Sequence, residues 1–276
     1  KAVNLVLPAT GLAAAVGFPA RDHEGRPVAD RLLFAVPWQG VTMVGTWYFE
    51  SEDSPDDLHV TPSQLSMMLE ELNSGFENWS FTARDVRMLH IGELPRSHLQ
   101  PQPAPVSRPL VAEASRFGGL RGAWVVQGEK WTTARATARE VTESISRQCG
   151  LRLEKSVSLT RSLEPRAEAG TAMPSVVCDI GDEIGPEHEA AIVHSLREEM
   201  VRTLPDLVLR RTNLGATGRP SPALLSSLAS IAARELNWDE AEKALNVTAM
   251  ERHRMYPDPA ELAVDSGLKQ SGTERT

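Results

Sequence analysis

The sequence predicts an α+β protein in which a mixed or antiparallel sheet precedes an all-helical C-terminal domain. Short segments rich in branched and aromatic residues gather before residue 155, and apolar residues recur at helical spacing after residue 187. Between them, scattered Pro, Gly, Arg and Glu without periodicity indicate a long connection. We therefore expect an α+β part over residues 1–154, a connecting segment over 155–186 and a helical domain over 187–276.

Five segments of the first part are typical of strands: VNLVLP, RLLFAVPW, VTMVGTWYF, DVRMLHIG and LRGAWVV. The second and third are expected to form a hairpin across residues 37–40. A helix is expected to begin at Thr61 and Pro62, since apolar residues then repeat at helical spacing over 65–72.

Three further helices are expected in the C-terminal part. Apolar stripes run over residues 192–200 and 224–232, and the second stripe follows a Ser221-Pro222 start signal. A third helix is expected to begin near Asp239.

Composition excludes several classes of function. The 276 residues include 37 acidic and 29 basic side chains, a net charge of -8, and the basic residues form no runs, so we expect no nucleic-acid partner. No apolar run approaches the roughly 20 residues that span a bilayer. Cys149 and Cys178 are expected to be buried free thiols. These features predict a cytoplasmic protein, either free or peripheral to the inner face of the cell membrane.

Residues 125–141, VVQGEKWTTARATAREV, run from a strand through a glycine turn into a helix. The start of a helix presents unpaired N–H groups and the positive end of the helix dipole, so it favours negative charge. In the alternative reading, Thr132 and Thr133 only cap the helix. One apolar face of this helix is expected to consist of Ala134, Ala138, Val141 and Ile145.

The segment GEKWTTAR resembles the GGKWTTYR segment of FAD-dependent glycerol-3-phosphate dehydrogenases. Other stretches resemble the same family in the same order, and together they cover most of residues 1–215. They are KAVNLVLP, FAVPWQGVTMVGT, SPDDLHVTPSQLSMMLEELN, FTARDVRMLHIGELP and EIGPEHEAAIVHSLREEMVRTLPDLVLRRTNLG. The last of these resembles the family's helical C-terminal domain.

The resemblance implies a flavin site at this turn. In the family, the segment places a helix start and backbone amides near the pyrimidine end of the isoalloxazine, where negative charge develops on reduction. It implies that Gly128, Lys130, Thr132 and Thr133 bind FAD, and that Arg108 and Lys130 bind the substrate.

Three departures from the family's pattern leave the substrate open. Glu129 replaces a glycine of the turn, and Asn4 takes the place of a histidine in the first strand. Leu94 stands where the family has an arginine that holds the substrate phosphate, and that arginine's fork of N–H donors has no equivalent in leucine.

The family's dinucleotide-binding motif is also missing. No G-x-G-x-x-G follows a strand and opens a helix, and the chain begins at Lys1 without a methionine. We therefore expect a C-terminal portion of a longer flavoenzyme, inactive by itself, in which tight FAD binding requires upstream residues.

Other candidate residues have structural alternatives. His90 is a candidate general base for a hydroxyl proton, or a hydrogen-bonded structural histidine. His188 and His194 are six residues apart, so no metal site is predicted. Core positions, or the aromatic walls of a flavin pocket, are expected for Trp38, Trp47 and Trp131.

The function predicted from these residues is that of an FAD-dependent oxidoreductase of glycerol metabolism. A hydride would pass from a hydroxyl-bearing carbon of a small-molecule substrate to the flavin, and electrons to a quinone or another acceptor at a membrane surface. The alternative is a non-catalytic relative whose helical domain is an interaction module. The oligomeric state is left open.

Overall fold

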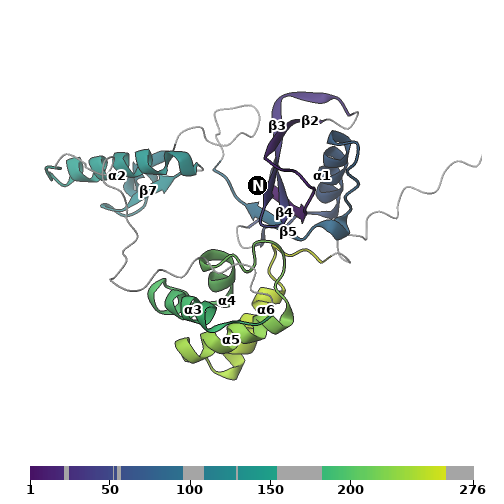
Figure 1. Ribbon diagram of the computed structural model, residues 1–276. Coiled ribbons are helices and arrows are strands. Elements are labelled where there is room, and N and C mark those ends of the chain that lie inside the picture. The colour runs from purple at the N-terminus through teal and green to yellow at the C-terminus, as the bar shows by residue number, and fades with distance from the viewer. Residues whose placement is uncertain are drawn as a thin grey trace, which may run out of the picture. The chain divides into compact units, whose positions relative to one another are not determined.

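The computed structural model describes residues 1–21, 25–51, 53–54, 57–95, 109–128, 130–153 and 182–258 (Figure 1). The chain forms two compact units. Residues 1–92 and 167–276 make up the first, and residues 93–166 make up the second. This grouping differs from the predicted parts, because the predicted sheet and the predicted helical domain fall in the same unit.

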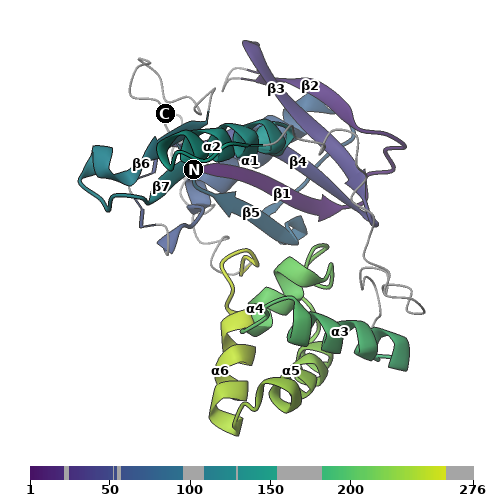
Figure 2. The same cartoon turned by 90° about the vertical axis from the view of Figure 1, so that its left-hand side faces the viewer.

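The first unit contains a five-stranded antiparallel sheet in the order β2-β3-β4-β1-β5, seen face-on in Figure 2. Its strands are β1 (Ala2–Pro8), β2 (Val16–Arg21), β3 (Pro27–Trp38), β4 (Val41–Tyr48) and β5 (Met88–Gly92). The predicted hairpin joins β3 to β4. Its two turn residues, Gln39 and Gly40, have φ of 45° and 75°, which suits the right-handed twist of the paired strands. Strand β2 was not predicted, and its edge position accommodates Pro19.

One face of the sheet packs against helix α1 (Pro62–Gly75). The helix begins as expected, with the Thr61 side chain and Gln64 forming a reciprocal capping box. The apolar residues that repeat over 65–72 are buried against alternate residues of β1, namely Val3, Leu5 and Leu7. Alternation along the strand therefore turns Asn4 and Val6 to the opposite face.

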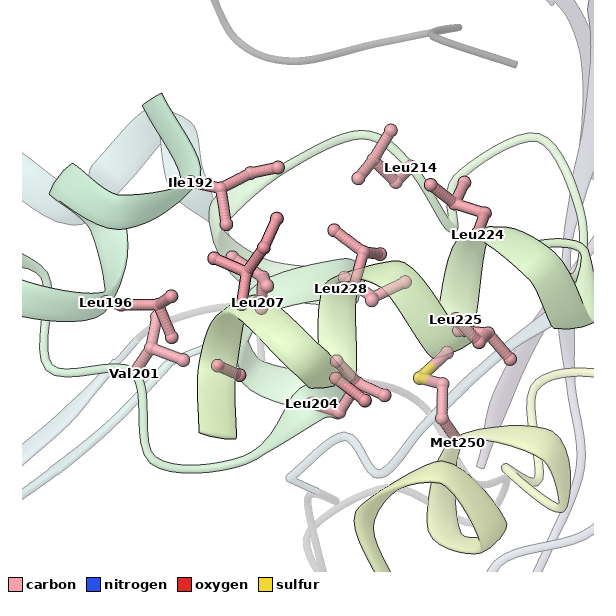
Figure 3. Packing of buried hydrophobic residues seen from close by; sticks show 14 of the residues in the cluster. Ile192, Leu196, Val201, Leu204, Leu207, Leu214, Leu224, Leu225, Leu228 and Met250 are labelled. Atoms are coloured by element: carbon pink, nitrogen blue, oxygen red, sulfur yellow. The ribbon is translucent and has the colours of Figure 1, made fainter. Parts of the chain in front are cut away.

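A bundle of helices follows in the same unit. It consists of α3 (Pro186–Glu198), the short turn α4 (Leu204–Asp206), the π-helical turn η5 (Leu207–Arg211), α5 (Pro222–Leu236) and α6 (Glu240–Glu251). Apolar side chains from these elements converge in one core (Figure 3). Val6, Val41 and Met88 of the sheet belong to that core. The bundle therefore covers part of the sheet face opposite α1.

The second unit is small. Strands β6 (Leu110–Glu113) and β7 (Trp124–Gln127) pair antiparallel, and the 3-10 turns η3 (Ala114–Phe117) and η4 (Trp131–Thr133) precede β7 and helix α2 (Ala134–Gln148), respectively. Cys149 is exposed at the end of α2, so the prediction that it is buried was wrong. Cys178 lies outside the described residues.

The predicted α+β class is confirmed, with an antiparallel sheet first and helices in the C-terminal half. The predicted boundaries at residues 154 and 186 mark changes of composition and stay a prediction. Within the described ranges, every helix is too short or too polar to cross a bilayer.

Candidate functional site

A cavity lies where the second unit changes from strand to helix. It has a volume of about 690 Å³, within the range of small-molecule sites. Residues of strand β7, the following turn and one face of α2 line it on one side, and it is open to solvent. The lining residues are Val126, Gly128, Lys130, Trp131, Thr133, Ala134, Thr137, Ala138, Val141 and Thr142. The segment that sequence reasoning singled out therefore forms the wall of a cavity.

The wall is largely apolar. Val126 comes from β7, and Ala134, Ala138 and Val141 recur along α2 at helical spacing. Trp131 is 93% exposed, so the prediction that it belongs to the core was wrong, whereas Trp47 is fully buried. An exposed indole beside an apolar wall provides a flat surface for a planar ligand.

Threonine hydroxyls fasten the turn to the helix. Thr133 Oγ1 donates to the Lys130 carbonyl over 3.0 Å, and Thr137 Oγ1 donates to the Thr133 carbonyl over 3.0 Å. Thr133 is the N-cap residue of α2, but its side chain makes no capping hydrogen bond. The first N–H groups of the helical segment have no acceptor within the helix, so the positive end of its dipole faces this turn.

Gly128 lets the turn pass close to the start of β6. A Cβ placed on Gly128 would lie 3.3 Å from the Cβ of Pro109. A larger residue there would require Pro109 to shift.

The predicted site residues fall into three groups. Gly128, Lys130 and Thr133 line the cavity, while Thr132 is exposed and is not part of its lining. Arg108 lies outside the described residues, as does Glu129. Sequence reasoning missed Val126 and Thr137 as lining residues. Helical spacing from Ala134 was a signal for Thr137, which lies three residues further along α2.

His90 lies in the other unit, on β5. It pairs directly with Asn4 of β1 in the antiparallel register, and both side chains are half-buried. Burial lowers the pKa of His90, so the neutral imidazole is favoured. Leu94, the residue at the family's arginine position, is also half-buried.

Comparison with known proteins points to one family. The model of the C-terminal domain of alpha-glycerophosphate oxidase matches residues 166–243. Among solved structures, the chain resembles the glycerol-3-phosphate dehydrogenase from Bacillus halodurans, determined in complex with FAD. The TM-score is 0.62 at 18% identity, over 94% of this chain and 57% of that one. No curated protein matches.

These matches confirm the predicted resemblance to the C-terminal portion of this family. The structural match establishes a shared fold, and the chain spans little more than half the length of the matched enzyme.

Proposed function

We propose that the chain is part of an FAD-dependent oxidoreductase and that the cavity beside α2 receives the isoalloxazine ring. One observation carries the proposal: Gly128, Lys130, Trp131 and Thr133, which line the cavity, belong to the segment through which the sequence resembles flavoenzymes. The likeness of the fold to an FAD-complexed dehydrogenase supports it independently.

The residues present fit a flavin ring. Apolar side chains and the exposed Trp131 suit a flat aromatic ring. The positive start of the helical segment favours the pyrimidine end of the flavin ring, where negative charge develops on reduction. When bound, flavin supplies a hydride acceptor that later gives up its electrons. Lys130, at the mouth of the helix start, would hold the polar carbonyl edge of the ring.

The proposed reaction is oxidation of a hydroxyl-bearing carbon in a small molecule, with electrons passed to a quinone or another acceptor. The matched family model and structure concern glycerophosphate enzymes. Leu94 replaces the arginine expected for a phosphate, so we propose the reaction type without that substrate. A cytoplasmic location, with contact to a membrane surface at the acceptor step, remains part of this proposal.

Riboflavin, which carries the ring without the dinucleotide, tests the cavity directly. We expect it to quench Trp131 fluorescence in the 276-residue chain because the indole lies in the cavity wall. The variant Trp131→Phe should lose that quenching, whereas Trp238→Phe, in the helical bundle, should retain it. Equal quenching in both variants would refute flavin binding at this cavity.

A further inference from the structure

Three polar side chains lie together on the sheet face opposite α1, and we call them the amide cluster: Asn4, Thr46 and His90. Asn4 stands directly across from His90 in the pairing of β1 with β5. The Thr46 hydroxyl donates to Asn4 Oδ1 over 2.8 Å. Directly opposed residues on one face of a sheet have Cβ atoms about 4.5–5.5 Å apart. One small molecule therefore reaches all three side chains.

The neighbouring strand makes room for this arrangement. A Cβ on Gly45 would lie 2.0 Å from Asn4 Oδ1 and 2.8 Å from its Cγ. The absence of a side chain at Gly45 thus allows the Asn4 amide to lie across β4 and meet Thr46. The orientation of the amide is consequently fixed by two residues of one strand.

The cluster retains hydrogen-bonding capacity. Thr46 occupies one lone pair of Asn4 Oδ1. In the part of the chain that the structure describes, neither the Asn4 amide nitrogen nor the His90 ring makes a hydrogen bond within the protein. The cluster therefore offers an N–H donor from Asn4 beside an imidazole that accepts in its neutral form.

Aromatic side chains flank the cluster on the same face. Phe34 pairs with Gly45 in the register of β3 with β4, and Tyr48 pairs with Ala2 in that of β4 with β1. They are 50% and 54% exposed, respectively. The face thus places exposed aromatic side chains on either side of a small neutral polar centre.

We propose that the amide cluster binds the hydroxyl group of an uncharged alcohol whose carbon skeleton packs on Phe34 and Tyr48. The alcohol oxygen accepts from the Asn4 amide, and its hydrogen is donated to the His90 ring. These neutral side chains do not balance the negative charge of a phosphate, which requires cationic side chains or several N–H donors.

This inference goes beyond the proposed function, because the amide cluster belongs to the first unit and the proposed flavin cavity belongs to the second. Within the cluster, His90 accepts the hydrogen of the alcohol hydroxyl, Asn4 donates to its oxygen, and Thr46 positions the Asn4 amide.

Three probe molecules separate the contributions of the hydroxyl group, the apolar ring and a negative charge to binding. Benzyl alcohol carries a hydroxyl and an apolar ring, toluene lacks the hydroxyl, and glycerol 3-phosphate carries charge. Each is titrated into the 276-residue chain while NMR follows the ring signals of His90 and the side-chain amide of Asn4. We expect saturable shifts of both with benzyl alcohol, weaker binding of toluene, and no saturable shift with glycerol 3-phosphate.

Variants complete the test. Asn4→Leu, of similar volume, should weaken benzyl alcohol binding about tenfold, a loss of about 1.4 kcal/mol, while His59→Gln, at an exposed histidine, should leave it unchanged. Equal affinity for toluene, tighter binding of glycerol 3-phosphate, or shifts that spare His90 and Asn4 would overturn the inference. Trp131 quenching by riboflavin reports on the proposed function separately, because it requires no alcohol.

Discussion

The indole Nε1 of Trp47 donates to the carboxylate of Glu71 over 2.6 Å, although both residues are buried. The same carboxylate accepts from the backbone N–H of Arg21 over 2.7 Å and from the Arg31 guanidinium over 3.2 Å. Glu71 therefore links α1 to strands β2, β3 and β4. A buried carboxylate is tolerated here because several donors satisfy it.

Replacing that carboxylate should destabilise the first unit. In Glu71→Leu the Trp47 and Arg21 donors lose their acceptor, and an unsatisfied buried donor costs about 1–3 kcal/mol. We expect a loss of that order in the free energy of unfolding by urea. Glu70→Leu, at the exposed neighbouring position, is the control. Equal losses in the two variants would show that the hydrogen bonds are irrelevant.

A methyl group at Gly45 should disturb the amide cluster. The added carbon of Gly45→Ala collides with the Asn4 side chain, so we expect a loss of about 1–3 kcal/mol in unfolding free energy. Gly92→Ala, where a Cβ meets nothing within 4 Å, should change it little. Adding Asn4→Ala to Gly45→Ala should restore part of the loss; if it restores none, the collision lies elsewhere.

The helical core should be sensitive to truncation of its leucines. Leu225 is 1% exposed and packs in the bundle core, so Leu225→Ala should cost about 2–5 kcal/mol. Leu245, on α6, is 69% exposed, and Leu245→Ala should cost far less. Thermal unfolding of both variants measures the difference. Comparable losses would contradict the packing in Figure 3.

Stability should decline as pH falls below the ordinary histidine pKa of about 6.5. Burial lowers the pKa of His90, and burial followed by the charges of Arg254 and Arg210 lowers that of His253. Between the folded and unfolded pKa values the unfolded chain binds more protons, so unfolding is favoured as pH drops. The double variant His90→Gln, His253→Gln should flatten the dependence of urea stability on pH as the pH falls through the ordinary histidine pKa. An unchanged slope would contradict these shifts.

Lys130 should contribute to flavin affinity. A charged donor at the carbonyl edge of the ring is worth about 1.5–3 kcal/mol, so Lys130→Ala should weaken riboflavin binding at least about tenfold. Lys243→Ala, on α6, is the control for loss of a positive charge. Trp131 quenching measures both, and equal affinity in the two variants would remove Lys130 from the site.

Local patterns in the sequence predicted much of the fold. Helix starts at Thr61, Ser221 and Asp239 were confirmed because side-chain capping depends on residues within one turn. Strand β2 escaped prediction because Gly17 and Pro19 interrupt its pattern, and its place is set by pairing with β3.

The same distinction applies to the candidate site. The cavity beside α2 uses residues contiguous in sequence, so a strand, a turn and a helix face were enough to locate it. The pairing of Asn4 with His90 depends on a register between segments more than eighty residues apart. Periodicity along one strand carries no information on that register, so the amide cluster required the structure.

Val6, Val41 and Met88 of the sheet belong to the same hydrophobic core as the helical bundle. The backbone N–H of Leu89 on β5 also donates to the Met255 carbonyl beyond α6 over 2.7 Å. Because the helices bury apolar residues of the sheet, the helical bundle is not a domain that could be exchanged independently of the sheet. A recombination event that separated the sheet from the bundle would expose these three buried sheet residues. We therefore expect the sheet and the bundle to be inherited together and to unfold together.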